Sequence, residues 1–140
     1  MQGGGMTFTE AELRYLASQR LGRLATLAHD GTLQNNPVGF EVNTDLGVID
    51  IGGWNMGLSR KWKNVGEHPE VSIVIDDLAS VQPWAVRGIE IRGRAEGVTG
   101  VERAPGSHLS GELIRIHPHR ILTWGLDGQP EDMKRRWIRR

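Results

Sequence analysis

The stretch 85–98 constrains the fold most, because apolar and charged residues alternate along its length. The apolar members are Val86, Ile89, Ile91 and Ala95, and between them stand Arg87, Glu90, Arg92, Arg94 and Glu96. A period of two is typical of a strand with one buried face and one solvated face. Gly88 and Gly93 interrupt the pattern, as glycines do where a strand bends at the corner of a barrel. The stretch therefore predicts one long, twisted, half-buried strand.

The residues before this strand predict a helix followed by a hairpin. Thr9-Glu10-Ala11-Glu12 is a capping box, so a helix begins there, and we expect it to stop near 20–22. The segment 24–28 is expected to be a strand, Asp30-Gly31 a hairpin turn, and 32–42 the returning strand. Pro37 lies inside the returning strand and marks an edge, a bulge or a place where another group approaches the backbone.

The second half continues the antiparallel pattern. A turn at 43–47 leads into a strand at 48–51, a short helix at 58–66 and a strand at 70–76. We expect a connection over 77–84, a loop over 99–111, and one or two strands over 112–124 around Pro118. Strands and helices do not alternate, which argues against a doubly wound fold. The expected fold is mainly β with flanking short helices, a small antiparallel barrel whose N-terminal helix covers one end.

Length and charge distribution predict how the chain is divided. With 140 residues we expect one barrel domain at 8–126, a flexible leader at 1–7 and a basic tail at 127–140. The bases of the tail are Lys134, Arg135, Arg136, Arg139 and Arg140. The tail is either a solvated terminus or a segment that pairs with an anionic ligand or a partner subunit.

Charge balance and cysteine content exclude several function classes. The chain has 17 basic and 17 acidic residues, which argues against general nucleic-acid binding. The absence of cysteine excludes disulfides, thiolate metal sites and a cysteine nucleophile. No apolar run reaches the length of a membrane span and no signal peptide is apparent, so we expect a cytoplasmic location.

A glycine-rich turn followed by basic residues is the strongest candidate site. Gly52-Gly53 break the strand at 48–51, and Ser59, Arg60, Lys61 and Lys63 follow at the start of the short helix. Glycines let backbone N–H groups approach phosphate oxygens, and a helix N-terminus and cationic side chains add positive charge. The alternative is a solvated basic helix face, because neither a Walker motif nor a dinucleotide fingerprint is present.

Two further stretches could wall a planar ligand. The segment Asn36-Pro37-Val38-Gly39 is either a plain edge strand or an irregular wall of a ligand site. Trp84 and Arg87 can enclose a heterocycle between an aromatic face and a guanidinium group. The alternative for Trp84 is burial at a dimer contact.

The remaining polar residues predict neither a metal site nor a nucleophile. His117 and His119 share one strand face, but Pro118 separates them and no third ligand lies at a familiar spacing. Ser59 lacks a nucleophile elbow, and Asp76-Asp77 are expected to form a turn. We therefore expect a bound cofactor that carries the chemistry itself.

Taken together, the motifs resemble one family. They include Leu21-Gly22-Arg23-Leu24-Ala25-Thr26, Asn36-Pro37-Val38-Gly39-Phe40, Ile49-Asp50-Ile51-Gly52-Gly53, Ser59-Arg60-Lys61-Trp62-Lys63-Asn64, Pro83-Trp84-Ala85-Val86-Arg87-Gly88 and Ile114-Arg115-Ile116-His117-Pro118-His119. The set is similar to the pyridoxamine 5′-phosphate oxidase-like split barrels, and more narrowly to the actinobacterial branch that uses the deazaflavin coenzyme F420. The similarity runs from about Phe8 to Leu126, most of the chain.

The resemblance implies a fold, an assembly and a set of site residues. The fold would be a six-stranded antiparallel split β-barrel, and the protein a homodimer with two cofactor sites at the interface. Ser59 and Lys61, with Arg60 or Lys63, would hold the cofactor phosphate. The segment Asn36-Pro37-Val38-Gly39 would lie along the tricyclic ring. Trp84 and Arg87 would line the site from the same or the other subunit.

The resemblance also implies an activity. The leading hypothesis is an oxidoreductase in which reduced F420 passes a hydride to a conjugated C=C bond of a small acceptor, with dehydrotetracycline-type polyketides of antibiotic biosynthesis as one candidate class. The alternatives are an FMN-dependent oxidase or reductase of the same fold and a non-catalytic F420 carrier. A heme-binding role ranks last, because His117 and His119 are its only apparent ligands. The sequence identifies no catalytic acid.

Overall fold

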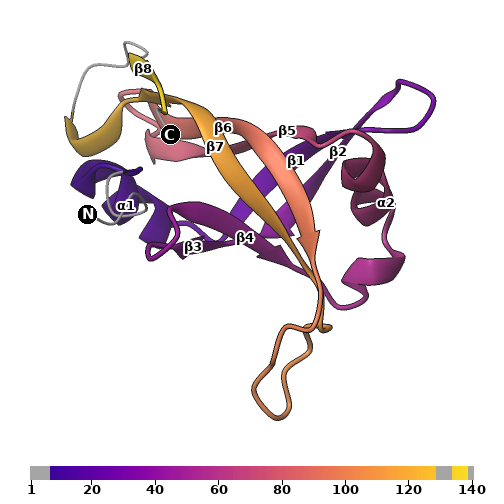
Figure 1. Ribbon diagram of the computed structural model, residues 1–140. Coiled ribbons are helices and arrows are strands. Elements are labelled where there is room, and N and C mark those ends of the chain that lie inside the picture. The colour runs from indigo at the N-terminus through magenta and orange to yellow at the C-terminus, as the bar shows by residue number, and fades with distance from the viewer. Residues whose placement is uncertain (1–6, 129–133, 139–140) are drawn as a thin grey trace.

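One curled antiparallel sheet dominates the computed structural model, which describes residues 7–128 and 134–138 (Figure 1). Within these residues the strand order is β2-β1-β5-β6-β7-β4-β3, and β8 pairs with β7. This confirms the expected mainly β, antiparallel barrel. The elements are α1 (Glu10–Ala17), β1 (Leu21–Leu27), β2 (Leu33–Gly39), β3 (Glu41–Asn43), β4 (Val48–Gly52), η2 (Met56–Leu58), α2 (Arg60–Glu67), β5 (Glu70–Ser80), β6 (Ala85–Val98), β7 (Leu113–Trp124), η3 (Leu126–Gly128) and β8 (Lys134–Trp137).

The strand count differs from the six strands that the resemblance implied. The returning strand expected over 32–42 is divided at Phe40 into β2, which pairs with β1, and β3, which pairs with β4. The break occurs because one continuous segment serves two different neighbours. The further strand is β8, which the tail contributes. Eight strands are thus present among the described residues.

Strand β6 has the bounds that the alternating stretch predicts, and it pairs with β5 and β7 along its length. Its two glycines admit close neighbours. A Cβ atom on Gly88 would lie 2.6 Å from the ring of Trp124, and one on Gly93 would lie 2.3 Å from the carbonyl oxygen of His117. The register between β6 and β7 shifts beside Gly93, and β7 continues through Pro118 as one strand.

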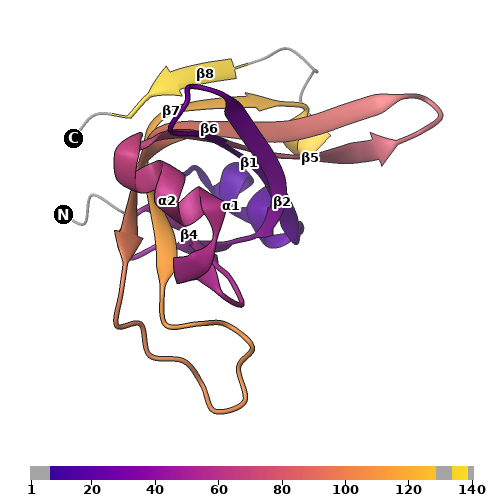
Figure 2. The same cartoon turned by 90° about the vertical axis from the view of Figure 1, so that its right-hand side faces the viewer.

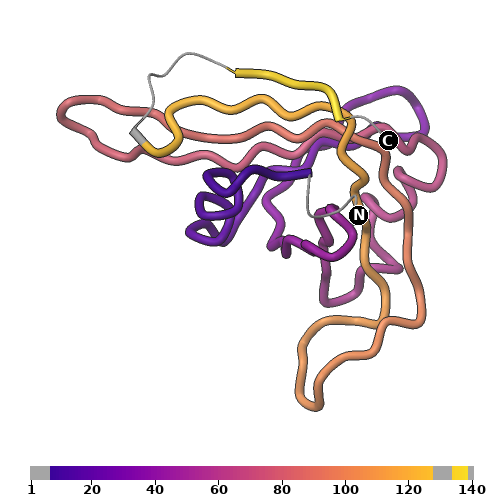
Figure 3. The backbone as a smooth tube through the Cα atoms, turned by 60° about the vertical axis from the view of Figure 1, so that its left-hand side comes forward, coloured from indigo at the N-terminus to yellow at the C-terminus, as the bar shows by residue number. Residues whose placement is uncertain are grey.

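The prediction of a connection over 77–84 is wrong. Strand β5 continues to Ser80, and Leu78 and Ser80 pair with Val86 and Ala85 of β6. These pairs extend the two strands into a hairpin that projects well beyond the barrel (Figure 3). Asp77 therefore lies within a strand.

The core is rich in isoleucine. Ile49, Ile73, Ile89, Ile91 and Ile116 show no solvent exposure. The two helices cover opposite ends of the curled sheet, as Figures 1 and 2 show. The Thr9 capping box is present, and α1 ends at Ala17, before the expected 20–22, because Ser18 already adopts the C-cap and β1 starts at Leu21.

The C-terminal tail adds a strand to the sheet. Arg120 to Thr123 of β7 pair with Lys134 to Trp137 of β8. Arg136 of β8 donates to both carboxylate oxygens of Glu12 at 2.5 and 2.7 Å, and to the carbonyl oxygen of Thr7. Thr7, the last residue of the expected leader, is buried, whereas residues 1–6 lie outside the described part. No helix among the described residues is long and apolar enough to span a membrane.

Candidate functional site

The corner between β4 and α2 is built around Ser59, which is the N-cap of α2. The Ser59 hydroxyl accepts the backbone N–H of Trp62 at 3.2 Å and donates to the carbonyl oxygen of Met56 at 2.7 Å. The backbone N–H groups of Arg60 and Lys61 have no intrahelical acceptor because they belong to the first helical turn. The sequence thus places two N–H groups without an intrahelical acceptor and a cationic side chain at one helix end.

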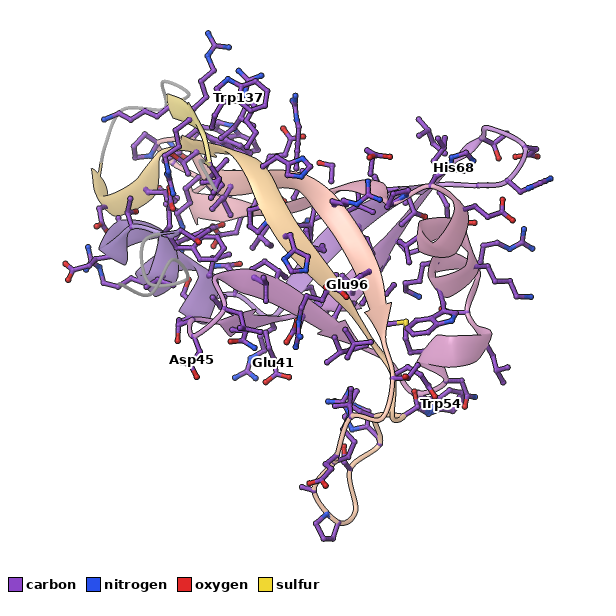
Figure 4. All side chains as sticks on the ribbon, in the orientation of Figure 1. Glu41, Asp45, Trp54, His68, Glu96 and Trp137 are labelled. Atoms are coloured by element: carbon purple, nitrogen blue, oxygen red, sulfur yellow. The ribbon has the colours of Figure 1, made fainter. Side chains whose placement is uncertain are left out.

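A hollow of about 440 Å³ opens at this corner. Its lining is Gly53, Trp54, Asn55, Met56, Leu58, Ser59 and Lys61. Trp54 and Leu58 leave 70% and 80% of their surface exposed, so the hollow combines apolar surface with one ammonium group. Arg60 and Lys63 are exposed but lie outside the lining. Figure 4 shows Trp54 at the α2 end of the molecule.

Gly52 and Gly53 serve mainly to admit neighbouring side chains. A Cβ atom on Gly52 would lie 3.3 Å from Leu109, and one on Gly53 would lie 3.3 Å from Met56. The carbonyl oxygen of Gly53 accepts the backbone N–H of Ser110 at 2.8 Å. Neither glycine is among those with positive φ. The pair thus accommodates the 99–111 loop, a contact that sequence analysis missed.

The stem of this loop also accepts hydrogen bonds from two backbone N–H groups of the corner. The N–H of Met56 donates to the Ser110 hydroxyl at 3.0 Å, and the N–H of Gly57 donates to the Glu112 carboxylate at 3.2 Å. Arg103 donates to the carbonyl oxygens of Ser110 and Glu112, which holds the stem together. The N–H groups of Met56 and Gly57 are therefore already engaged, whereas those of the first turn of α2 have no intrahelical acceptor.

A second, smaller hollow of about 210 Å³ lies on the other side of Gly52. It is lined by Gly39, Phe40, Glu41, Asp50, Gly52, His108 and Leu109. Asp50 within it accepts two hydrogen bonds from Arg115, at 2.9 and 3.1 Å. The two hollows flank the Gly52-Gly53 turn, and Gly39 of the predicted wall lines the second one.

The rest of the predicted wall follows the edge strand β2. Pro37 pairs with Arg23 of β1, and β2 is an edge strand among the described residues, which is where a proline is tolerated in a sheet. Val38 is buried in the core. Asn36 accepts from the Gln34 amide at 2.8 Å, and Gln34 in turn accepts from Asn64 at 2.8 Å.

Asn64 ties α2 to the sheet, although its motif gave no sign of this role. Its side chain is buried, and it also donates to the Thr26 hydroxyl at 3.0 Å. A chain of amide hydrogen bonds therefore runs from Asn36 on β2 to α2. This chain links the corner between β4 and α2 to the predicted wall.

No protein-family model matches the chain. A curated relative is 45% identical over 125 residues, which cover 88% of this chain and 87% of the relative. That relative is the 5a,11a-dehydrotetracycline/5a,11a-dehydrooxytetracycline reductase of Streptomyces rimosus subsp. rimosus. The chain belongs to the dehydrotetracycline reductase family.

Solved structures place this family among the split barrels. A conserved hypothetical protein of Mycobacterium tuberculosis matches with a TM-score of 0.64 and 26% identity, over 84% of both chains. A pyridoxamine 5′-phosphate oxidase-related, FMN-binding protein of Nostoc punctiforme matches with a TM-score of 0.64 and 12% identity, over 97% of this chain and 100% of that one. A solved F420 reductase matches with a TM-score of 0.56 and 21% identity, over 74% of this chain and 89% of that one.

In this member of the dehydrotetracycline reductase family, Trp84 and Arg87 lie away from the corner between β4 and α2 and line neither of the two hollows. Both belong to the β5–β6 hairpin, which projects away from α2 (Figure 3). Arg87 makes a bidentate pair with Asp77 at 2.7 and 3.0 Å, and its guanidinium lies 5.2 Å from the Tyr15 ring centroid. Trp84 is exposed.

The Asp77 cluster shifts two pKa values. Hydrogen bonds from Arg87, and then from Tyr15 and Gln19, hold the pKa of Asp77 below its ordinary value despite partial burial. Burial and the hydrogen bond to Asp77 raise the pKa of Tyr15. Both groups therefore keep one charge state at neutral pH, which suits a structural tie between α1 and the hairpin.

The histidines form no cluster. His117 lies 2.5 Å from Glu96 across β6 and β7, while His119 lines a different part of the sheet. No group of three or more His, Asp or Glu side chains among the described residues could hold a metal ion.

Proposed function

We propose that this protein is an F420H2-dependent reductase that acts on a conjugated C=C bond of a dehydrotetracycline-type polyketide. The observation that carries the proposal is the 45% identity to a dehydrotetracycline reductase over 88% of the chain. Reduction by that relative supports the oxidoreductase class. The solved F420 reductase of the same fold supports F420 as the reductant.

The residues at the corner between β4 and α2, called the phosphate corner below, fit a phosphorylated cofactor. The Lys61 ammonium group and the first-turn N–H groups of α2 would hold the phosphate, because all of them present positive charge to the first hollow. Ser59 would act through the helix, since its hydroxyl is already engaged with Trp62 and Met56. Trp54 and Leu58 would cover apolar parts of the ligand and exclude water.

Bound F420H2 would supply a hydride from C5 of its ring to an electron-poor carbon of the acceptor. The chain itself would supply orientation. Gly39 lines the second hollow, and a Cβ atom on it would have no neighbour within 4 Å, so this position leaves room beside a planar ring. The Asp50–Arg115 pair neutralises its own charge and leaves this hollow nearly uncharged, apart from Glu41.

We also propose a homodimer. Leu33, Val81 and Trp84 are large apolar side chains that expose 80%, 70% and 65% of their surface. A second copy would cover these side chains. It would also bring Trp84 and Arg87 toward the cofactor, as the resemblance implies.

FMN is the second candidate cofactor, because the FMN-binding protein of the same fold matches the whole architecture. A parallel titration of the purified protein with F420 and FMN separates the two. We expect Lys61→Ala to raise the Kd for F420 by about tenfold to a hundredfold, since a charge-assisted contact contributes about 1.5–3 kcal/mol. Lys63→Ala is the matched control, because Lys63 is a lysine of the same helix outside the hollow.

Preferential binding of FMN would replace F420 in the proposal and leave the phosphate corner in place. Equal effects of the two lysine substitutions would remove the assignment of Lys61. A turnover assay with F420H2 and a dehydrotetracycline, monitored by the loss of F420H2 absorbance, tests the reaction itself. Binding of F420 without turnover of any enone would favour a carrier.

A further inference from the structure

A third hollow lies between α1 and the edge strand β3, with a volume of about 420 Å³. Its apolar lining consists of Leu13, Leu16, Ala17, Phe40 and Val42. Its polar lining consists of Gln19, Glu41 and Thr44. A hollow of this size, apolar on one side and polar on the other, suits a drug-sized ligand.

The third hollow continues the second one. Both are lined by Phe40 and Glu41, while the second reaches Gly52 and the first begins at Gly53. The three hollows therefore follow one another along β4 and β3, from the helix N-terminus of α2 to the apolar face of α1. Figure 4 shows Glu41 projecting from this side of the sheet.

The third hollow depends on the interruption between strands β2 and β3 at Phe40. Because β2 ends at Gly39 and β3 begins at Glu41, Phe40 is free of the ladder and stands between the second and third hollows. Strand β3 has only three residues and is the last strand of the sheet order, so no further strand of the described part of the chain pairs with its outer edge. Leu13, Phe40 and Val42 pack against the core yet remain partly exposed.

We propose that this hollow binds the acceptor, a flat polycyclic polyketide with hydroxyl and carbonyl groups along one edge. The inference rests on the proposed function and assigns the acceptor to a place in it. The fused rings would lie against Leu13, Ala17 and Phe40, and the oxygen-bearing edge would face Glu41 and Gln19. The conjugated bond would then reach the second hollow past Phe40.

The reaction balances with the reductant already proposed. One carbon of the conjugated C=C bond gains a hydride, the bonding electron pair moves toward the neighbouring carbonyl, and the other carbon gains a proton from water. The acceptor is reduced by two electrons, and F420H2 is oxidised by two. The residues of the third hollow take no part in the transfer and act by positioning.

Filling the hollow tests this assignment. Ala17→Trp would place an indole in it at an exposed position of α1, and Leu46→Trp would place the same side chain on the neighbouring β3–β4 turn, outside the hollow. The probe is tetracycline, a stable member of the class, titrated against the protein without cofactor. We expect Ala17→Trp to raise its Kd by about tenfold or more while the Kd for F420 changes less than about twofold. Leu46→Trp should change neither.

The outcomes are distinct. If wild-type protein does not bind tetracycline, or Ala17→Trp binds it as tightly as wild type, the assignment of the acceptor is overturned. If Ala17→Trp loses F420 but keeps tetracycline, the hollow belongs to the cofactor. Failure of F420 to bind wild-type protein would overturn the proposed function alone, since the tetracycline titration needs no cofactor.

A second measurement avoids any folding defect in the variant. Amide hydrogen exchange of wild-type protein, with and without tetracycline, reports protection along the backbone. We expect added protection in 13–19 and 40–44. Protection confined to the sheet face around Leu33 and Val71 would place the ligand elsewhere and reject the assignment.

Discussion

At the scale of single residues, Ser59 separates two roles that its motif combines. Its hydroxyl caps α2, and a direct bond to a phosphate would require that hydroxyl to leave Met56. Lys61, two residues later, is free to face the hollow. The two residues therefore affect a ligand differently, one through helix geometry and one through charge.

This separation predicts a contrast between two substitutions. Ser59→Asn and Ser59→Asp both keep an N-cap acceptor, so the free energy of unfolding should change by less than about 0.5 kcal/mol in each. Ser59→Asp adds a negative charge beside the phosphate, so the Kd for F420 should rise by about tenfold or more relative to Ser59→Asn. Urea unfolding and ligand titration measure the two effects. Equal affinities of the two variants would place the phosphate elsewhere.

Asp77 predicts a pH-dependent stability. Its pKa is depressed in the folded state, so its contribution is present above the ordinary carboxyl pKa and is lost as the pH falls through the folded value. Asp77→Asn should lower the free energy of unfolding by about 1–2 kcal/mol at pH 7, a range that already allows for the partial exposure of Asp77. The loss should become smaller as the pH falls below about 4. Thermal unfolding of the wild type and of Asp77→Asn from pH 3 to 7 measures this difference in stability. A constant difference across the range would contradict it.

Local chemistry could be predicted from the sequence where it depends on neighbours along the chain. The Thr9 capping box, the bounds of β6 and the start of α2 near Ser59 all follow from short patterns. The packing of Leu109 on Gly52 and the bond from Met56 to Ser110 could not, because they join residues more than fifty positions apart. His108 and Leu109 carried no motif that would mark them as pocket residues.

At the scale of elements, β8 and α1 stabilise each other through one ion pair. The Glu12 side chain is only 4% exposed, and it accepts from Arg136 on β8 as well as from the N-cap backbone of Thr9. A buried carboxylate left without its partner is costly. The tail predicted as a solvated or ligand-binding segment is therefore, in its described part, a structural strand.

Removing the arginine should test this link. Arg136→Ala is expected to lower the free energy of unfolding by about 2–4 kcal/mol, since it leaves the Glu12 carboxylate buried and unpaired. Arg135→Ala is the control on the same strand, where an exposed side chain should matter by less than about 0.5 kcal/mol. Hydrogen exchange should show faster opening of α1 in the first variant only. Similar losses in both would indicate a general effect of tail charge.

At the scale of the whole molecule, the projecting β5–β6 hairpin is the feature that an isolated chain leaves unexplained. Leu78, Val81 and Trp84 expose apolar surface on it, and Arg87 at its base is neutralised by Asp77. The second copy proposed above would cover both the hairpin and the exposed Leu33.

The homodimer proposal gives a direct expectation. Light scattering after size exclusion should report twice the chain mass of 15.6 kDa. Trp84→Glu should shift the protein toward the single-chain mass and also raise the Kd for F420, because a charge would replace apolar surface at the interface. Leu46→Glu, on the β3–β4 turn, should do neither. Wild-type protein that binds F420 while it has the mass of a single chain would refute the proposed dimer.

The pairing of Glu12 with Arg136 also bears on synthesis of the protein. The Glu12 carboxylate is translated 124 positions before Arg136, its ion-pair partner in the described structure. Until that arginine has been translated and β8 has paired with β7, α1 must either stay undocked or bury an uncompensated charge. Docking of α1 is therefore coupled to synthesis of β8, which delays closure of the helical wall of the third hollow until both partners have been translated.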